Sequence, residues 1–504
     1  MRPVRIIQLA ALAGLLALSG SACSTKKVMQ PNIAPQTHLF VQYDANDGGP
    51  HTVFHVARLY WYGSDPDGFV QGYDIRFIWP AGDQNPPWTR TANTDSLFVI
   101  PDTTGISNPT FQVRAVDNDG LADPQPPQQT FSFSNQAPVV TLVDPPGLNE
   151  VTFASQTIDW VGVDPDGDAG LLTFRVWLEG NQANPHILTG NELTLPTSDF
   201  LTGGQLRAGL DTATVFVQAI DPGGRVSNIA SATWRVRPPV PNPAQRARLL
   251  LIDDISTADD ASGNYDRFYN TAVANSGLPV GSWSVLQLES GRTFRSSKDL
   301  EQSLGLFDAV VWYRGSARYS STRDTMLARH SDGLGAYLNA GGKFYLESLD
   351  MISSGPTSGL LPESFMQDFM GSDSLFKHKP FGSNDRIPNF SISRESYVDS
   401  INGVEVHHLA LLHSTLFADS LESRINTGGL RAFGVRDTAD VVLWARDSTL
   451  KELQPFDAPI AVKSQTTSGG KLVATSVQIL GLGGFTAPTA RFISKIFVYL
   501  GIAP

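Results

Sequence analysis

Charged and hydroxyl side chains directly follow apolar runs in the C-terminal half of the sequence. The run RLLLIDD ends in two acids, FDAVVWYRG in an arginine and a glycine, and KFYLES in an acid and a serine. If these runs are parallel strands, their carboxyl ends meet at one edge of a sheet, where ligands of such sheets bind. The candidate ligand-binding residues are Asp253, Asp254, Arg314, Glu347, Ser348 and Asp350.

Ser348 is the candidate nucleophile of this group. Histidines that could serve as its base occur at His330, His378, His407, His408 and His413. However, the sequence around Ser348 has no G-x-S-x-G elbow, and a serine after a strand commonly caps a helix or bonds within a turn. We therefore expect Ser348 to be structural. The alternative is an exported hydrolase that uses this serine or the strand-end acids on a glycan or peptide.

A second group of acids, in the N-terminal half, could supply oxygen ligands to Ca²⁺. Asp164, Asp166 and Asp168 alternate along DPDGD, and Asp221 falls at the corresponding end of a later strand. An EF-hand would need a glutamate where Arg175 stands, so that motif fails. Because Asp and Gly also stabilise turns by themselves, we expect no cofactor here and keep calcium as the alternative.

The only cysteine, Cys23, follows a segment with the pattern of a secretory signal. Arg2 and Arg5 precede an apolar run from Ile6 to Leu18, and the small residues SGSA come next. This run is shorter than the roughly 20 residues that a membrane-spanning helix needs. A single cysteine also excludes disulfides within the chain. We expect residues 1–22 to be a signal peptide and the protein to be exported.

Small residues that end directly at a cysteine resemble the lipobox of bacterial lipoproteins. The resemblance implies cleavage before Cys23, acylation of this residue and a stable membrane anchor, since several acyl chains hold a protein where one does not. Gly20 occupies the usual leucine position, and Leu18 lies two places upstream. An ordinary signal peptide with an incidental cysteine is the alternative. Ser24 resembles the residue that sorts lipoproteins to the outer membrane.

The charge of the chain limits its partners. The formal net charge is -12 over 504 residues, and loss of the two arginines in 1–22 makes the mature chain more acidic. Nucleic acid and anionic lipid headgroups repel such a protein. We therefore expect no nucleic-acid partner, and we expect contact with the membrane to be made through Cys23.

Two passages of the N-terminal half repeat each other after about 100 residues. LYWYGSDPDGFVQGYDIRF matches IDWVGVDPDGDAGLLTFRVWL, so that Trp61 corresponds to Trp160, and FQVRAVDNDG matches VFVQAIDPGG. Short alternating runs that end in Asp, Pro and Gly predict antiparallel strands of a β-sandwich. The early Trp, the later aromatic (Tyr73 or Phe174) and the V-x-A-x-D strand resemble fibronectin type III and related immunoglobulin-like modules. In those modules the Trp and the later aromatic pack between the sheets.

From residue 248 onward, apolar runs alternate with helical patterns, which predicts a parallel sheet covered on both faces. GGKFYLES and the late VQ-bearing run before a terminal helix resemble class I glutamine amidotransferase-like domains, which are three-layered and flavodoxin-like. Active members carry a cysteine after the first run and a His-x-Glu pair after the second. Here Leu480 and Leu482 stand at the His and Glu positions. Leucine cannot transfer a proton, so the resemblance implies a domain without glutaminase activity.

These patterns predict a multidomain protein of two β-sandwiches and one α/β domain. The expected parts are a signal peptide (1–22), a tether (23–36), a fibronectin type III-like sandwich (37–136), a second sandwich (137–238), a Pro-rich linker (239–247) and an α/β domain (248–504) with an insertion (351–440). We expect a lipid-anchored envelope protein whose sandwiches present a non-catalytic module that binds a glycan, a peptide or another envelope protein. The alternatives are the hydrolase and a purely structural role in assembly.

Overall fold

A computed structural model describes most of the chain beyond residue 30. The described residues are 31–41, 52–54, 56–80, 82–99, 106–165, 169–207, 210–242, 244–256, 260–288, 294–314, 326–348, 361–373, 433–436, 440–446, 457–480, 484–485 and 487–502, together with short strands between 390 and 430. Within this part, no helix is both long enough and apolar enough to cross a membrane. Cys23, Asp166, Asp168 and Asp350 lie outside the described residues.

The first half of the chain begins with a β-sandwich, as the alternating runs predict. One sheet has the order β1 (Gln36–Val41), β3 (Val56–Ser64) and β6 (Asp95–Val99). The other has the order β5 (Thr89–Thr91), β4 (Val70–Ile78), β8 (Thr110–Asp117) and β9 (Gln128–Thr130). A small third sheet joins β2 (Thr52–Phe54), β10 (Ser132–Ser134) and β7 (Ile106–Ser107).

A buried aromatic pair holds these two sheets together. Trp61 of β3 lies edge to face against Tyr73 of β4, with ring centroids 6.4 Å apart. Trp61 also packs on Phe111, and its ring nitrogen donates to the carbonyl of Asn93 at 2.8 Å. The predicted packing of the early Trp against the later aromatic is therefore confirmed in this sandwich.

The second sandwich repeats this arrangement. One sheet has the order β11 (Val139–Val143), β13 (Gln156–Val163) and β16 (Glu192–Leu195). The other has the order β12 (Val151–Thr152), β20 (Val226–Val236), β19 (Thr212–Ile220), β14 (Thr173–Leu178) and β15 (His186–Leu188). Trp160 and Phe174 meet between the sheets with centroids 5.6 Å apart, which confirms the corresponding prediction for this copy.

The C-terminal region is built on one nine-stranded sheet. Five neighbouring strands are parallel, in the order β22 (Trp283–Gln287), β21 (Leu249–Asp254), β23 (Ala309–Arg314), β24 (Lys343–Ser348) and β35 (Lys471–Thr475). The sheet continues with antiparallel strands β34 (Asp457–Gln465), β33 (Asp440–Arg446), β29 (Leu411–His413) and β30 (Ser420–Glu422).

The antiparallel strands correct the prediction of a wholly parallel sheet. β34 ends at Gln465 and β35 begins at Lys471, and these two residues are directly paired. Thr466 closes the turn between them, because its hydroxyl accepts the amide hydrogen of Gly470 at 2.9 Å. A turn this short cannot contain the crossover of a dozen or more residues that parallel neighbours require.

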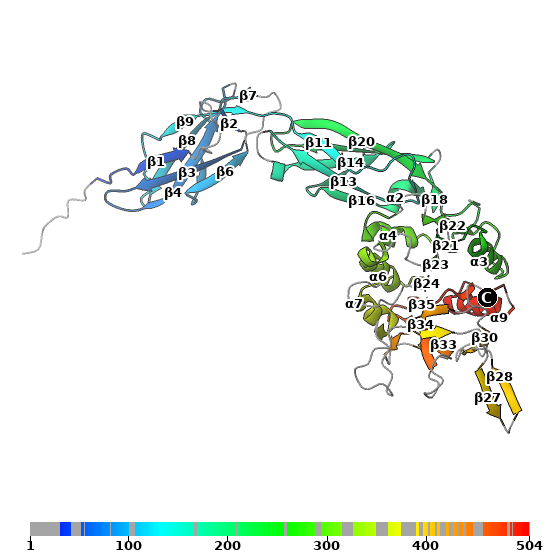
Figure 1. Ribbon diagram of the computed structural model, residues 1–504. Helices are drawn as coiled ribbons and strands as arrows, with labels where there is room; N and C mark the ends of the chain where they lie inside the picture. The colour runs from blue at the N-terminus through cyan, green and yellow to red at the C-terminus, as the bar shows by residue number, and fades with distance from the viewer. Residues whose placement is uncertain are drawn as a thin grey trace, which may run out of the picture. The chain divides into compact units, whose positions relative to one another are not determined.

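Helices cover both faces of the parallel strands (Figure 1). α3 (Asn264–Ala274) and α9 (Ala487–Leu500) pack on one face, in a core that includes Leu249 and Leu251. α4 (Ser297–Leu304) and α6 (Ser331–Asn339) pack on the other, with Leu250 and Ile252. A turn at His330 separates the short helix α5 (Met326–Arg329) from α6. A short α7 (Glu363–Phe365) continues into a π-helical turn at Met366–Met370.

The body of the second sandwich and the C-terminal region belong to one compact unit, while the first sandwich lies in another. Phe153 of the second sandwich is 1% exposed and meets Phe307 edge to face at 5.3 Å. Close by, Arg295 pairs with Glu150 at 2.7 Å. The Pro-rich segment 239–247 comes after the last strand of this sandwich in the chain, and Val240 within it is 3% exposed. The sandwich is therefore packed directly on the C-terminal region.

Candidate functional site

Polar residues form two rows at the carboxyl edge of the parallel sheet. In register, Asp253 pairs with Tyr313, Tyr313 with Glu347, and Glu347 with Thr475. One residue further along the strands, Asp254 pairs with Arg314 and Arg314 with Ser348. Because consecutive residues of a strand point to opposite faces, the first row faces α3 and α9, and the second row faces α4 and α6. Five of the six predicted ligand-binding residues therefore share one edge but lie on two faces.

The row on the α4 and α6 face is sealed from solvent. Arg314 and Asp254 are 4% and 5% exposed, and Arg314 Nη1 lies 3.4 Å from Asp254 Oδ2. The indole nitrogen of Trp312 donates to the same oxygen at 3.3 Å. Both charged side chains are therefore enclosed by protein and turned toward each other rather than toward solvent.

Ser348 lies at the end of this row and is fully buried. No substrate can reach its hydroxyl unless the surrounding side chains move. Leu480, at the position where the amidotransferase resemblance would require a histidine, is 6% exposed and belongs to the hydrophobic core beside Ile479. The arrangement of these residues suits packing better than acyl transfer.

The row on the α3 and α9 face contains a buried acid that is held by two phenols. Tyr269 donates its hydroxyl hydrogen to Glu347 Oε2 at 2.7 Å, and Tyr345 donates to the same oxygen at 2.8 Å. Glu347 is fully buried, and this burial raises the pKa of its carboxyl to about 7, although the two phenols act in the opposite direction. Burial therefore places the pKa of this carboxyl near neutral pH, far above its usual range.

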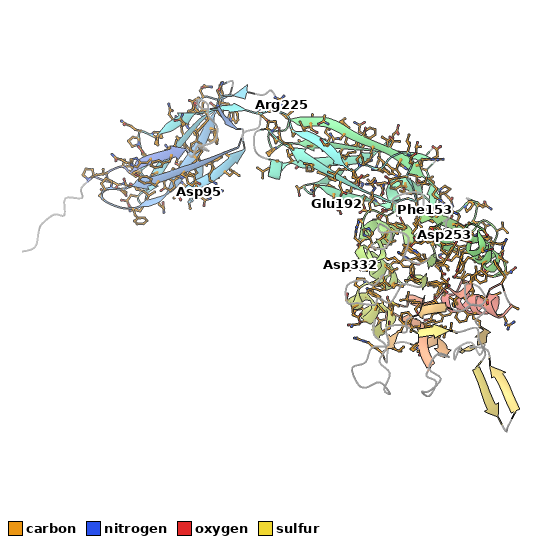
Figure 2. All side chains as sticks on the ribbon, in the orientation of Figure 1. Asp95, Phe153, Glu192, Arg225, Asp253 and Asp332 are labelled. Atoms are coloured by element: carbon orange, nitrogen blue, oxygen red, sulfur yellow. The ribbon has the colours of Figure 1, made fainter. Side chains whose placement is uncertain are left out.

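Asp253 (labelled in Figure 2) is only partly buried, whereas the strand-end acids Asp254 and Glu347 are buried. Its Oδ1 accepts the amide hydrogen of Ile255 at 3.0 Å. Burial, followed by the nearby carboxyls of Asp266 and Asp260, raises the pKa of Asp253 to about 7.

The N-terminal turn of α3 brings the other acids to this point. Asp260 accepts the amide hydrogens of Asn264 at 2.7 Å and Tyr265 at 2.8 Å, so it caps the helix. Asp266 lies in the first turn and accepts the hydroxyl hydrogen of Tyr313 at 2.8 Å. Asp253, Asp260, Asp266 and Tyr265 are all only partly buried. Together they form a half-open acidic site, which we call the acidic corner.

Gln478 connects the acidic corner to the centre of the sheet edge. Its side-chain oxygen accepts the hydroxyl hydrogen of Tyr265 at 3.0 Å, and its side-chain nitrogen donates to the carbonyl of Arg314 at 3.1 Å. Our sequence reasoning did not single out Tyr265, Asp266 or Gln478. The sequence feature that could have pointed to this region is the helical pattern DRFYN, which follows the first strand of the sheet. The first turn of such a helix borders the edge of the sheet where ligands bind.

The proposed calcium ligands of the second sandwich are only partly described. Asp164 is 6% and Asp221 4% exposed. Asp221 Oδ1 accepts the amide hydrogen of Arg225 at 2.9 Å, which is a turn-stabilising bond of the expected kind. Among the described residues, no three His, Cys, Asp or Glu side chains are grouped so that they could hold a metal ion.

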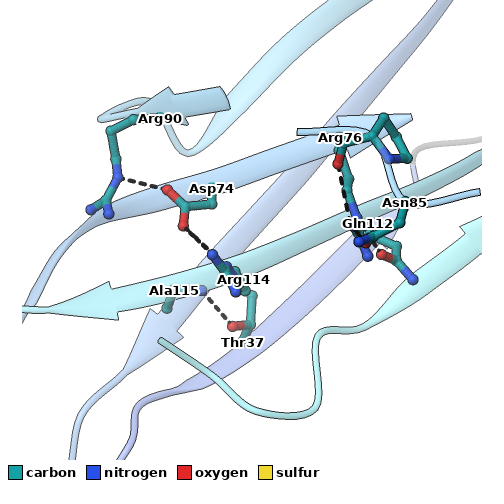
Figure 3. A network of polar contacts seen from close by, with 9 residues as sticks. Thr37, Asp74, Arg76, Asn85, Arg90, Gln112, Arg114 and Ala115 are labelled. Atoms are coloured by element: carbon teal, nitrogen blue, oxygen red, sulfur yellow. Dashed lines mark hydrogen bonds and ion pairs between the residues drawn. The ribbon is translucent and has the colours of Figure 1, made fainter. Parts of the chain in front are cut away.

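A charged network covers the outer face of sheet β5-β4-β8-β9 in the first sandwich (Figure 3). Asp74 is 7% exposed, and it pairs with Arg90 at 2.7 Å and with Arg114 at 3.0 Å. The guanidinium groups of Arg114 and Arg76 both lie over the ring of Trp88, at 4.4 and 4.1 Å from its centroid. These residues satisfy one another, so this face is stabilised from within.

Comparison with known proteins finds structural neighbours at low TM-scores. No protein-family model matches the chain, and no curated protein matches it either. Solved structures that match include the fibronectin(III)-like modules of Clostridium thermocellum CbhA, which are 15% identical and for which the match covers 40% of this chain and 94% of that one, with a TM-score of 0.18. The PKD1 domain of Vibrio anguillarum Epp is 14% identical, with coverages of 20% and 96% and a TM-score of 0.15. The FN1–FN3 domains of chicken CNTN1 are 14% identical, with coverages of 42% and 69% and a TM-score of 0.17.

These neighbours are fibronectin III-like and PKD-like sandwich domains of the immunoglobulin type. At such low TM-scores they say nothing about activity. The class of the N-terminal half therefore rests on its own strand order and on the Trp61–Tyr73 and Trp160–Phe174 pairs.

Proposed function

We propose that this protein is a lipid-anchored envelope protein whose C-terminal region is a binding module without catalytic activity. The N-terminal pattern that ends at Cys23 supports export and acylation, and Ser24 favours the outer membrane. The β-sandwiches would then serve as spacers. The strand order 2-1-3-4-5 of the five parallel strands supports a flavodoxin-like origin, and the amidotransferase resemblance supports a degenerate relative of that family.

One observation carries the non-catalytic part of this proposal. The serine at the candidate nucleophile position is fully buried, and a buried leucine occupies the position of the base. Acyl transfer requires a nucleophile and a base within hydrogen-bond reach of each other and of the substrate. A buried hydroxyl at the end of β24 does not meet this requirement.

Of the described residues at this edge, those of the acidic corner are only partly buried, so a ligand can reach them. Its carboxyls and phenols offer hydrogen-bond acceptors and negative charge, which suit the hydroxyls of a glycan or the basic side chains of a peptide or envelope protein. Asp253→Asn combined with Asp266→Asn would remove two of the three carboxyls of the corner while keeping its shape. Asp332→Asn, at an exposed position of α6, is the matched control.

The test compares acylated wild-type protein with the Cys23→Ser form and with these variants. Mass spectrometry of the N-terminal peptide should show acyl chains on Cys23 in the wild-type protein and no acyl chains in the Cys23→Ser form. Chemical crosslinking in intact envelopes should then yield partners or glycan fragments that are lost in the Asp253/Asp266 double variant and kept in Asp332→Asn. Equal recovery from all variants would contradict a role for the acidic corner.

A hydrolase remains the second candidate because of one specific observation. Asp253 and Glu347, at the strand ends, both have pKa values of about 7. Carboxyls whose pKa values are raised in this way often act in catalysis. Purified protein should be assayed against ester, amide and glycoside substrates, with Ser348→Ala and Asp253→Asn as the variants. Turnover that either substitution abolishes would replace the binding proposal with this one.

A further inference from the structure

The outer face of sheet β1-β3-β6 in the first sandwich carries a row of exposed aromatic side chains. Phe40 of β1 is 52% exposed and Tyr62 of β3 is 48% exposed, and Leu97 of β6 is 47% exposed. The register pairs His38 with Tyr62 and Phe40 with Tyr60, and such paired side chains point to the same face. We call the set His38, Phe40, Tyr60, Tyr62 and Leu97 the aromatic face.

The rings of the aromatic face are ordered among themselves. His38 stacks on Tyr62 with centroids 4.6 Å apart and 26° between planes. Phe40 stacks on Tyr62 with centroids 5.6 Å apart and 11° between planes. Three nearly parallel rings therefore stand side by side on the sheet. Their mutual packing leaves about half of the Phe40 and Tyr62 surface in contact with solvent.

The two outer faces of this sandwich differ in charge. On the aromatic face itself, Arg58 lies opposite Leu97 and Asp95 lies opposite Tyr60, and these two charged residues form an ion pair at 3.1 Å, so their charges cancel. The outer face of the other sheet instead carries Asp74 with its arginines (Figure 3). Tyrosine and other aromatic rings are enriched where proteins meet the headgroup layer of a membrane. The aromatic face has the composition of an interfacial surface, and the charged face does not.

The chain that leads into this sandwich is held at the end of the sandwich where β8 stops and the turn between β3 and β4 lies. Asn32 donates its side-chain amide to Asp117 Oδ2 at 2.6 Å, and the amide of Ile33 donates to Asp67 Oδ2 at 3.1 Å. Cys23 precedes Asn32 by nine residues, which span at most about 30 Å when fully extended. A domain of this size has a radius of gyration of about 13 Å. An anchor at Cys23 therefore holds the first sandwich within about one domain diameter of the bilayer.

We propose that the aromatic face docks on the lipid headgroup layer of the membrane that holds the anchor. This inference rests on the proposed acylation of Cys23, because that anchor keeps the first sandwich close to the membrane. The rings supply the contact, and because the face is neutral the contact does not depend on anionic lipid. The first sandwich would then lie against the membrane as a foot rather than stand free of it.

The single cysteine makes the experiment direct. In the mature acylated protein Cys23 carries lipid, so a cysteine introduced by Phe40→Cys or Tyr62→Cys is the only free thiol and can take an environment-sensitive NBD dye. Gln128→Cys, at an exposed position of the other sheet, is the matched control. Each protein is reconstituted into vesicles of phosphatidylethanolamine, with and without phosphatidylglycerol.

We expect the dye at positions 40 and 62 to brighten and shift to the blue in both kinds of vesicle. Quenching by aqueous iodide should fall several-fold there and stay unchanged at position 128. A second measurement avoids labelling the face: Phe40→Ser with Tyr62→Ser should keep the acylated protein on the vesicles while β1 loses protection from hydrogen exchange. Equal iodide quenching at positions 40 and 128 in acylated protein would overturn the docking.

Two further outcomes separate this inference from the proposed function. If mass spectrometry finds no acyl chain on Cys23 and the protein does not float with vesicles, the anchor itself is disproved. If the dye at position 40 brightens without vesicles and in proportion to protein concentration, a second copy of the chain covers the face. That result would overturn membrane docking and leave the anchor standing.

Discussion

Tyr269 and Tyr313 lie face to face with ring centroids 4.3 Å apart, yet their hydroxyls serve two different acids. Tyr269 donates to Glu347 inside the core, while Tyr313 donates to Asp266 at the half-open corner. The stacked pair therefore lies between a buried carboxyl and a partly buried one. Two acids near the pair, Glu347 and Asp253, have pKa values of about 7.

The first prediction concerns pH. Because the pKa of Glu347 is raised from 4.5 to about 7 on folding, the folded state binds a proton more tightly than the unfolded state. The free energy of unfolding should therefore be highest at or below pH 4.5 as far as this group is concerned, and fall by roughly 3 kcal/mol as the pH rises through 7. Urea denaturation at pH 5 and pH 8 measures this difference.

Glu347→Gln should reduce that pH dependence, because glutamine does not titrate. Asp253 and Asp299 also have raised pKa values and contribute slopes of the same sign, so part of the dependence will remain. Glu179→Gln, at an exposed turn, is the control and should leave the slope unchanged. An unaltered slope in Glu347→Gln would show that this carboxyl is ionised in the folded protein.

The second prediction concerns the buried pair of Arg314 and Asp254. Arg314→Met leaves a carboxylate without its counter-charge in the interior, which should lower the free energy of unfolding by about 3–5 kcal/mol. Adding Asp254→Leu removes the stranded charge and should restore much of the loss. Arg246→Met breaks an ion pair whose arginine side chain is 76% exposed, and we expect less than about 1 kcal/mol there.

The third prediction concerns the contact between the second sandwich and the C-terminal region. Phe153→Ala removes a ring that is 1% exposed and packs against Phe307, which should cost about 3–5 kcal/mol. A fragment that begins at residue 137 should unfold in one calorimetric transition, and Phe153→Ala should split it into two. Ile229→Ala, at a 50% exposed position of β20, should keep the single transition. Two transitions in the unmodified fragment would disprove the coupling.

The fourth prediction concerns the charged network of the first sandwich. Asp74→Asn leaves Arg90 and Arg114 without their shared carboxylate and should lower the free energy of unfolding by about 1–3 kcal/mol. Asp95→Asn breaks an exposed pair with Arg58 and should cost less than about 1 kcal/mol. Thermal unfolding of residues 31–138 as an isolated fragment compares the two. Equal effects would mean that Asp74 is solvated in spite of its burial.

Sequence periodicity predicted much of this architecture, because strands that bury one face must alternate and strands that bury both must be apolar throughout. The pairs Trp61–Tyr73 and Trp160–Phe174 were predicted from the resemblance to fibronectin type III modules, in which these rings pack between the sheets. The antiparallel direction of β34 was not predictable, because its run PIAVKSQ is as apolar as a parallel strand. The turn at Thr466 decides its direction.

The sequence predicted at which edge of the sheet the candidate site lies, but not how its side chains are arranged. Strand ends identified Asp253 and Glu347, but neither spacing nor composition indicates that Tyr269 and Tyr345 bond to one oxygen of Glu347. That geometry depends on the angle at which α3 crosses the sheet, which is set by packing. Likewise, the contact of Phe153 with Phe307 joins segments far apart in the chain, and a Pro-rich connection gave no sign of it.

The pleat of β21 separates the neighbours Asp253 and Asp254, so that one carboxyl meets water and other acids while the next is enclosed with an arginine. Deleting a single residue from Leu249–Ile252 would exchange their surroundings, because a shift of one position turns every side chain of a strand to the other face. The arginine would lose its counter-ion and the open corner would receive the wrong acid. The length of this strand therefore matters more for the arrangement of the edge than the identity of its individual side chains.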